Sequence, residues 1–259
     1  MLLNNANGNV TGPGSSTATT GVMVEATAPR ATLNGCFIFC SGGAYSGFGT
    51  GLLVNGNAAR VNFVSANNNG RGIVLDGTSP ALFLSAGSNN VGNGVVVNST
   101  AIAPLLNTVS ANQNGKTGIK LNQVSGGLIE NPTSSNNGQY GVWLNGTTGT
   151  SVTDPVANSN TIAGIFLGCS GTGPSAAVCA VPTKGNVVMK VLSSSSTVTV
   201  NGPSQKYGVV VDTGSRLNRV ELITANSNTT DDMFDGNLNC DNNLWFLDTL
   251  TNKNQSCIQ

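Results

Sequence analysis

Residues 72–75 read Gly72-Ile73-Val74-Leu75, and this order of glycine, aliphatic residue, any residue and aliphatic residue returns along most of the chain. The other copies are Gly21-Val22-Met23-Val24, Gly51-Leu52-Leu53-Val54, Gly94-Val95-Val96-Val97, Gly118-Ile119-Lys120-Leu121, Gly141-Val142-Trp143-Leu144, Gly164-Ile165-Phe166-Leu167 and Gly208-Val209-Val210-Val211. From Gly51 to Gly164 the copies recur at a nearly constant step, and the last step, from Gly164 to Gly208, is about twice as long. Such a period indicates a stack of repeated supersecondary units.

The remaining steps along the chain fit the same period. We expect the step from Gly164 to Gly208 to hold two turns, with a degenerate copy near Gly185-Asn186-Val187-Val188. One further step of the ordinary size from Gly208 reaches Asp231-Asp232-Met233-Phe234, and the longer first step, from Gly21 to Gly51, holds an insertion around 36–49. The prediction is one domain over 1–259, with an irregular segment at 1–20, coils at 21–248 and a disulfide-closed cap at 249–259.

The repeat unit selects the fold class. Each period also holds a second short β-like run that leads into an Asn-rich turn, and no segment has helical spacing. A strand of four residues cannot bury its face alone, but stacking at about 4.8 Å per coil pairs each strand with its own copies. The sequence therefore predicts an all-β parallel β-helix of about ten coils of 21–24 residues, with both aliphatic positions of each unit facing inward.

Glycine and asparagine are expected at the corners of the coils, where positive φ is common. An asparagine recurs shortly before the repeat, at Asn67, Asn89, Asn112, Asn136, Asn158 and Asn226. Stacked asparagine side chains can hydrogen-bond to one another and to turn backbone. We therefore expect an asparagine ladder along one corner.

Composition excludes several functional classes. The 11 basic and 11 acidic residues give zero net charge, so the basic surface that nucleic-acid binding requires is absent. No stretch is apolar for long enough to span a membrane. The chain has no histidine, which removes the commonest general base and every Ser-His or Cys-His nucleophile pair.

Six cysteines suit disulfides and an oxidising compartment. Cys169 with Cys179, and Cys240 with Cys257, would each close a short loop. Cys36 and Cys40 can pair only across a turn, because the extended segment between them would span roughly 13 Å and a disulfide tolerates at most about 7 Å between Cα atoms. Residues 1–5 lack the apolar region of a signal peptide. We expect a fragment or mature part of a longer exported protein, located outside the cell or in the periplasm.

The Gly-Ile-x-Leu unit, the Ser-x-Asn-x-Asn-Gly turn and the regular step resemble the right-handed parallel β-helix repeat family. The resemblance covers roughly Gly21 to Asp248. Within this family the chain is similar to NosD-like periplasmic proteins and, more distantly, to pectate-lyase-like enzymes. The segment from Asp231 to Cys257 resembles the terminal segment of secreted bacterial β-helix proteins of unassigned role. The resemblance implies the fold and the right-handed coil, and it leaves the function open because this fold carries many activities.

The third residue of each unit should face outward, and this column is unusually apolar. It reads Leu53, Val74, Val96, Lys120, Trp143, Phe166, Val210 and Met233. Trp143 and Phe166 would lie on adjacent coils about 5 Å apart, with Lys120 beside them. They predict either an aromatic platform for sugar rings, or a stripe covered by the loop from Cys169 to Cys179, the first segment or a partner chain.

An acidic segment follows the last coil. Asp235, Asn237, Asn239 and Asp241 alternate like the start of a calcium loop, although the sixth-position glycine and the closing glutamate of an EF-hand are missing. The alternative is a disulfide-closed cap built from Asx turns. Asp232 replaces an inward aliphatic residue in this register, and near the last coil its carboxylate could cap unpaired strand N–H groups.

Catalysis has one weak candidate cluster. Family hydrolases use several Asp residues with histidine motifs, and here Asp231-Asp232 is the only adjacent Asp pair in a chain without histidine. Family lyases use an Arg or Lys base beside calcium-binding carboxylates, which Arg216 and Arg219 near Asp231 and Asp232 could imitate. Surface charges brought together by chance explain the same residues.

The leading hypothesis is therefore an exported β-helix protein that binds a polysaccharide or another extended surface ligand without catalysis. One alternative is a structural or adhesin-type module whose apolar stripe packs on a second copy or an adjacent domain. The other is a polysaccharide lyase or epimerase. No cofactor is expected, apart from the calcium ion considered above.

Overall fold

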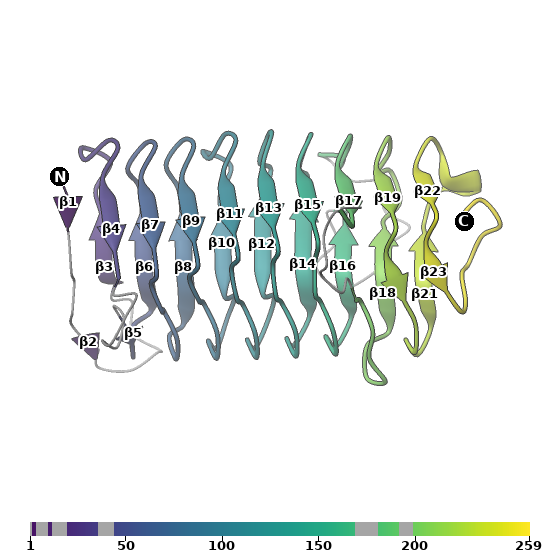
Figure 1. The fold of residues 1–259 in the computed structure, drawn as a ribbon, viewed down its shortest axis with the longest axis horizontal. Coiled ribbons are helices and arrows are strands. Elements are labelled where there is room, and N and C mark those ends of the chain that lie inside the picture. The colour runs from purple at the N-terminus through teal and green to yellow at the C-terminus, as the bar shows by residue number, and fades with distance from the viewer. Residues whose placement is uncertain (1, 4–9, 12–19, 36–43, 169–180, 192–198) are drawn as a thin grey trace.

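The computed structural model describes residues 2–3, 10–11, 20–35, 44–168, 181–191 and 199–259, whose strands stack as parallel rungs along one axis (Figure 1). The first sheet has nine strands: β3 (Thr20–Val24), β6 (Thr50–Val54), β8 (Arg71–Leu75), β10 (Val95–Val97), β12 (Ile119–Asn122), β14 (Tyr140–Asn145), β16 (Ala163–Leu167), β18 (Tyr207–Val211) and β21 (Asp231–Asp235). The second has ten: β1 (Leu2–Leu3), β4 (Thr32–Asn34), β7 (Arg60–Asn62), β9 (Ala81–Phe83), β11 (Leu105–Asn107), β13 (Leu128–Glu130), β15 (Ser151–Thr153), β17 (Val187–Met189), β19 (Arg219–Glu221) and β22 (Leu244–Phe246). The predicted parallel β-helix is confirmed.

Shorter elements complete each coil. A third face is formed by single bridges that run from Ser65 through Ala86, Ser110, Thr133 and Val156 to Thr199 and Thr224. Two small pairs extend it, β2 (Val10–Thr11) with β5 (Tyr45–Ser46) and β20 (Thr224–Ala225) with β23 (Thr249–Leu250). In the described ranges the helical segment is the 3-10 turn η1 (Leu238–Cys240), and no helix there is long and apolar enough to cross a membrane.

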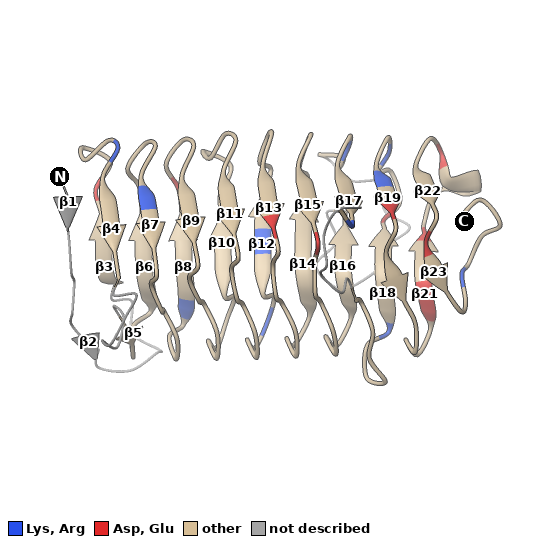
Figure 2. Cartoon of the chain, viewed as in Figure 1, with Lys and Arg blue, Asp and Glu red and all other residues tan. Residues whose placement is uncertain are grey.

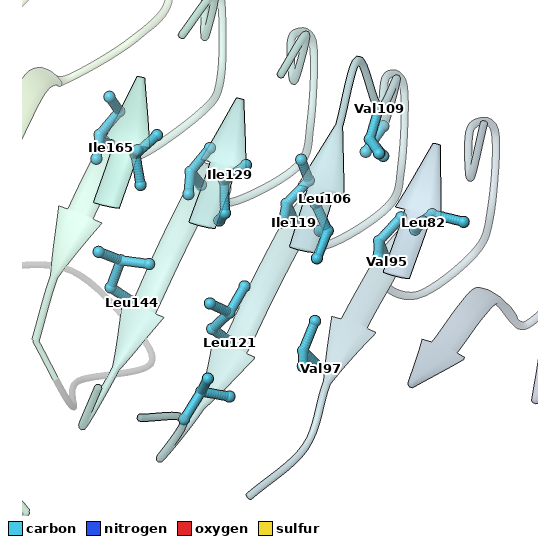
Figure 3. Packing of buried hydrophobic residues seen from close by; sticks show 14 of the residues in the cluster. Leu82, Val95, Val97, Leu106, Val109, Ile119, Leu121, Ile129, Leu144 and Ile165 are labelled. Carbon is cyan, nitrogen blue, oxygen red and sulfur yellow. The ribbon is translucent and has the colours of Figure 1, made fainter. Parts of the chain in front are cut away.

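The inward ladder has the predicted register. Ile73 pairs with Val95, Val95 with Ile119, Ile119 with Val142, and Val142 with Ile165, and all five side chains are fully buried. Leucines and isoleucines of the second sheet, such as Leu106 and Ile129, pack against this ladder from the opposite side (Figure 3). Burial of an aliphatic side chain contributes roughly 1.5–3 kcal/mol. The repeated ladder is therefore the core of the fold.

The prediction of two turns between Gly164 and Gly208 is wrong. The strand β16 pairs directly with β18 in the first sheet, whereas β17, which contains the supposed degenerate copy, pairs with β15 and β19 in the second sheet. This stretch therefore makes a single turn, enlarged by residues that lie partly outside the described ranges. Nine strands in the first sheet define eight complete turns between them.

The glycine that opens each unit has a different role from the predicted one. A Cβ atom built on Gly72 would lie 2.3 Å from the carbonyl oxygen of Gly94 on the next coil. Gly72 has no positive φ, whereas Phe63, Leu84 and Leu222 adopt left-handed φ values of 57°, 46° and 56° at one corner. The opening glycine is therefore required by close approach of two backbones, and many corners use larger residues.

Candidate functional site

Lys120, Trp143 and Phe166 lie side by side on β12, β14 and β16, as predicted. Trp143 is only 6% exposed and Phe166 is fully buried, so of the two alternatives the burial favours a covered stripe over an open aromatic platform. The two ring centroids are 6.2 Å apart in an edge-to-face arrangement. Binding of a ligand by these residues stays a prediction, and it would require the rings to become exposed.

A second hydrophobic cluster explains this burial. It lies on the outer side of the first sheet and comprises Tyr140, Trp143, Ala163, Phe166 and Val210, with Ile162, Tyr207 and Phe234 packed against it. Tyr140 lies between the other two rings, with its centroid 5.2 Å from that of Trp143 and 4.7 Å from that of Phe166. Trp143 donates its indole N–H to the carbonyl of Gly168 over 2.8 Å. The sequence pattern missed Tyr140 because it precedes the repeat unit.

Lys120 closes one end of this aromatic cluster. Its Nζ atom lies 3.7 Å from the centroid of the Trp143 ring, a cation–π contact. Burial of the side chain, and then the positive charge of Lys116, lower the pKa of Lys120. The ammonium group therefore contacts the ring while the residue remains partly exposed.

The outer face of the second sheet carries a different set of functional groups. The Arg60 guanidinium lies 4.1 Å from the centroid of the Phe83 ring, and Arg60 Nε donates to Asn62 Oδ1 over 3.1 Å. One coil further, Asn107 Nδ2 donates to Glu130 Oε2 over 2.6 Å. The pairing of β7, β9, β11 and β13 puts Asn62, Phe83, Asn107 and Glu130 in one outward column. Phe83, Asn107 and Glu130 are all partly exposed.

Sequence reasoning did not single out this column. Its residues lie on the second strand of each coil, and no recurring glycine precedes that strand to show its register in the sequence. Figure 2 shows a blue segment on β7, the strand of Arg60, and a red segment on β13, the strand of Glu130, and the strands β9 and β11 between them contain no charged residue. The combination of an aromatic ring, amides, a cation and a carboxylate is the one that binding sites for polar ligands use.

An asparagine ladder exists, but its buried rail is not the one predicted. The buried amides are Asn69, Asn90, Asn114, Asn137, Asn160, Gln205 and Asn228. The side-chain oxygen of Asn90 accepts the backbone N–H of Asn69, and Asn114, Asn137 and Asn160 repeat this bond at 2.9–3.0 Å. Of the predicted residues, Asn67, Asn112 and Asn158 form a parallel, less buried rail, while Asn89 and Asn136 occupy left-handed corners.

The buried ladder ends at Asp232. Asn228 donates its backbone N–H and its Nδ2 to Asp232 Oδ1, and Thr251 and Asn252 donate their backbone N–H groups to Asp232 Oδ2. An ionised carboxylate only accepts hydrogen bonds. It therefore suits the end of the amide ladder, where the neighbouring groups are all donors. Asp232 is expected to cap unpaired strand N–H groups. It does cap backbone N–H groups, but they belong to the turn before β21 and to the residues after β23.

The register of the last strand differs by one residue from the prediction. Met233 pairs with Val209, and Asp235 pairs with the inward Val211, because the last step is one residue longer than predicted. Met233 is therefore a buried inward residue, and Phe234 takes the outward position expected for Met233. Asp232 lies opposite the opening glycine, so the carboxylate that replaces an inward aliphatic residue is Asp235.

A second buried ladder ends at Asp235. Asn186 donates to Asn218 Oδ1, Asn218 donates to Asn243 Oδ1, and Asn243 Nδ2 donates to Asp235 Oδ2. The Trp245 indole N–H donates to the same oxygen over 3.0 Å, and Asn237 donates to Oδ1. Burial raises the pKa of Asp235, and these donors act in the opposite direction.

The four calcium candidates have different surroundings. Asp235 and Asn237 are buried and hydrogen-bonded to each other, to Trp245 and to backbone, whereas Asn239 and Asp241 are exposed. Among the residues described, no group of three or more His, Cys, Asp or Glu side chains could hold a metal ion. The oxygen atoms of Asp235 and the amide of Asn237 are therefore already hydrogen-bonded within the protein. Calcium binding by the four residues stays a prediction.

The lyase candidates are distributed over two sheets. Arg219 lies on β19 of the second sheet and forms an ion pair with Glu221, and Arg216 is an exposed residue before that strand. Asp231 and Asp232 lie on β21 of the first sheet, where burial and then the Asp232 charge raise the pKa of Asp231. The backbone thus places Arg219 and the two aspartates in different sheets, and Arg216 lies outside both.

Cys240 and Cys257 form a disulfide with a Cα–Cα distance of 6.2 Å, as the spacing predicted. The predicted pairs Cys36–Cys40 and Cys169–Cys179 lie outside the described residues.

The family described as right handed beta helix region matches residues 50–221. Among solved structures, the Dettilon tailspike protein gp208 is similar, with 14% sequence identity, a TM-score of 0.47, and a match that covers 90% of this chain and 50% of that chain. The chain thus spans about half the length of that protein. No curated protein matches the chain.

Proposed function

Because the chain belongs to the family of right-handed β-helix regions, whose rungs hold outward side chains in regular columns, we propose that it binds a polysaccharide or a similarly extended surface ligand without catalysis. The observation that carries the proposal is the outward column formed by Asn62, Phe83, Asn107 and Glu130. The Arg60 guanidinium stacks on the Phe83 ring of this column. An aromatic ring packs on the apolar face of a sugar, and amides and carboxylates bond its hydroxyl groups.

The spacing of the rungs supports an extended ligand. Neighbouring residues of one column lie about 4.8 Å apart, so a linear polymer running along the helix axis meets an equivalent position on each coil. Asn107 and Glu130 bond to each other within the column, and Arg60, from the same face, contacts both Phe83 and Asn62, which keeps the groups aligned. A preorganised column lowers the entropic cost of binding.

The location follows from the same proposal. A disulfide such as Cys240–Cys257 persists in oxidising compartments and is rare in the cytosol. We therefore propose that the protein acts outside the cell or in the periplasm, where polysaccharides are accessible.

A glycan array with purified protein tests the proposal. Phe83→Ala and Glu130→Gln should each reduce retention at least tenfold on whichever glycan the wild type binds, because they remove the ring contact and the charged acceptor. The control variant Leu217→Ala changes an exposed residue away from this column and should bind as the wild type does. Equal retention of all four proteins, or no retention of the wild type, would contradict the proposed function.

One observation favours a second candidate, a structural module that packs on another chain or domain. Leu238, Leu244, Phe246 and Leu247 are all exposed around β22 and the turn before it, a concentration of large apolar side chains at one end of the second sheet. Light scattering on Phe246→Ser and Leu247→Ser tests this candidate. A mass that falls from that of an assembly to that of a monomer would support it.

A further inference from the structure

The last strand of the first sheet is covered by the cap segment, which we define as residues 249–259. The cap residue Lys253 forms a parallel bridge with Met233, so the segment follows β21 in the place where another rung would lie. Within the same segment, β23 pairs with β20 and continues the third face of the coil. The cap segment therefore imitates part of the next coil.

Two asparagine side chains of the cap replace the backbone of that missing rung. Asn252 Oδ1 accepts the N–H of Asp232 over 2.7 Å, and Asn252 Nδ2 donates to the carbonyl of Thr230 over 2.9 Å. Asn254 repeats the arrangement, with Oδ1 accepting the N–H of Asp235 over 2.9 Å and Nδ2 donating to its carbonyl over 2.7 Å. An amide side chain carries the same donor and acceptor as a peptide group. The open edge of β21 is thus satisfied without a further strand.

The cap segment is fixed at both of its ends. Asp232 Oδ2 accepts the backbone N–H groups of Thr251 and Asn252, and the disulfide joins Cys257 to Cys240. Thr251, Asn252, Lys253 and Asn254 are all exposed polar or charged residues. The outer side of the cap therefore offers a further strand little apolar surface.

The opposite end of the stack has the complementary character. In the described part of the chain, β3 pairs on one side only, with β6. Met23 of β3 is 46% exposed, and it lines an apolar cavity of about 180 Å³ together with Val24, Ala31 and Leu33. Figure 1 shows β1, which pairs with β4 in the second sheet, and β3 toward one end of the stack, and β21 and β22 toward the other.

The repeat itself makes these two ends fit. All rungs are parallel and in register, so the free side of β3 has the backbone orientation that β21 would accept as its next rung. Contacts between unlike ends do not close into a dimer and propagate along one axis. Natural proteins cover such edges to prevent this pairing.

We propose that the cap segment is an internal competitor for the edge of β21, and that its displacement lets a second copy of this chain dock its β3 there, head to tail. The occupant is a second copy because β3 in this chain provides both the parallel register and the apolar ladder end that continues the core. Binding of the cap within its own chain has a high effective concentration, which keeps the intact protein monomeric.

An opened variant of the full chain tests the proposal. Cys240→Ser, Cys257→Ser, Asn252→Pro and Asn254→Pro together remove the disulfide and both asparagine contacts, while the coils from 50 to 221 are unchanged. Light scattering after size exclusion should show a weight-average mass that rises at least twofold with concentration, whereas the wild type stays at the 26.1 kDa monomer. At a protein concentration low enough to keep the opened variant monomeric, the backbone N–H groups of Asp232 and Asp235 should exchange faster than in the wild type, because Asn252 and Asn254 no longer accept them.

The control blocks the other end. Met23→Glu in the opened variant places a charge in the outward column of β3, at the end of the stack where a second copy would be contacted, and should return the mass to that of the monomer. An opened variant that stays monomeric, an assembly that persists with Met23→Glu, or a wild type that already assembles would each overturn the proposal. If the opened variant loses its β-sheet circular dichroism, the wild type treated with a dithiol reductant replaces it, and the same outcomes apply. Glycan retention is measured separately, so failure of the proposed function leaves this result intact.

Discussion

Asn228 Nδ2 donates to Asp232 Oδ1 over 2.8 Å, and this bond ends a ladder of buried amides that begins at Asn69. Each amide in the ladder accepts from the preceding coil and donates toward the next one, so the last amide presents donors only. The carboxylate of Asp232 supplies the acceptors. The second buried ladder, formed by Asn186, Asn218 and Asn243, ends in the same way, because Asn243 donates to Asp235. Both carboxylates lie on the last strand of the first sheet, so this strand terminates two amide ladders.

Asp232→Asn should destabilise the protein by about 2–4 kcal/mol. The substitution places an amide donor among four donors, and a buried donor without an acceptor costs about 1–3 kcal/mol. Urea unfolding followed by circular dichroism measures the change. Asp241→Asn is the control, because Asp241 is exposed, and it should change the unfolding free energy by less than about 0.5 kcal/mol. Equal midpoints for the two variants would show that Asp232 does not terminate the ladder.

Gly72→Ala should prevent normal stacking of two coils, because its Cβ would lie 2.3 Å from the Gly94 carbonyl oxygen. We expect a loss above about 3 kcal/mol, of the size seen for disrupted buried packing. Gly149 has a φ of +63° and open space around its Cβ position, so Gly149→Ala should cost only about 1 kcal/mol from backbone strain. Thermal unfolding of both variants separates the two roles, and a larger loss for Gly149→Ala would contradict this assignment.

Because the pKa of Asp248 is raised in the folded protein, we expect the unfolding free energy to depend on pH. Burial raises its pKa from 3.8 to about 7, with a smaller contribution from the Glu221 charge, against hydrogen bonds from Ile223 and Phe246. The folded state therefore holds this proton more tightly than the unfolded state, and the unfolding free energy falls as pH rises from about 4 to about 7. Asp248→Asn should be more stable than the wild type above pH 7, by on the order of 3 kcal/mol, and this advantage should vanish near pH 4. Parallel curves of unfolding free energy against pH would exclude the effect.

Trp143→Ala should lower stability by about 3–5 kcal/mol, the range for truncation of a buried aromatic residue. The indole is packed against Tyr140 and Phe166 and bonded to Gly168, so its loss leaves both a cavity and an unpaired carbonyl. Phe246→Ala is the matched control, since Phe246 is 45% exposed, and it should cost less than about 1 kcal/mol. Chemical unfolding compares them. A Trp143→Ala variant as stable as the wild type would mean that the ring is accessible, as a sugar platform requires.

Three features can be predicted from the amino-acid sequence alone: the period, the inward ladder from Ile73 to Ile165 and the parallel fold. These follow from local information, because a four-residue strand with two aliphatic positions has one way to satisfy both its backbone and its apolar face: stacking on its own copies. The cysteine spacing likewise predicted the link between Cys240 and Cys257. The presence of an amide ladder could also be inferred, since asparagine recurs in each period.

The features that depend on register between coils are visible only in the three-dimensional arrangement. Loops of unequal length separate the strands, so spacing alone could not assign Val187–Met189 to the second sheet or place Asp235 opposite Val211. Nor could it tell which of two neighbouring asparagines turns inward, as Asn69 does and Asn67 does not. The burial of Trp143 and Phe166 depends on Tyr140 and Gly168, which are not part of the repeated pattern. Packing on the outer face of a sheet is set by residues from other coils, and a one-dimensional period contains no record of them.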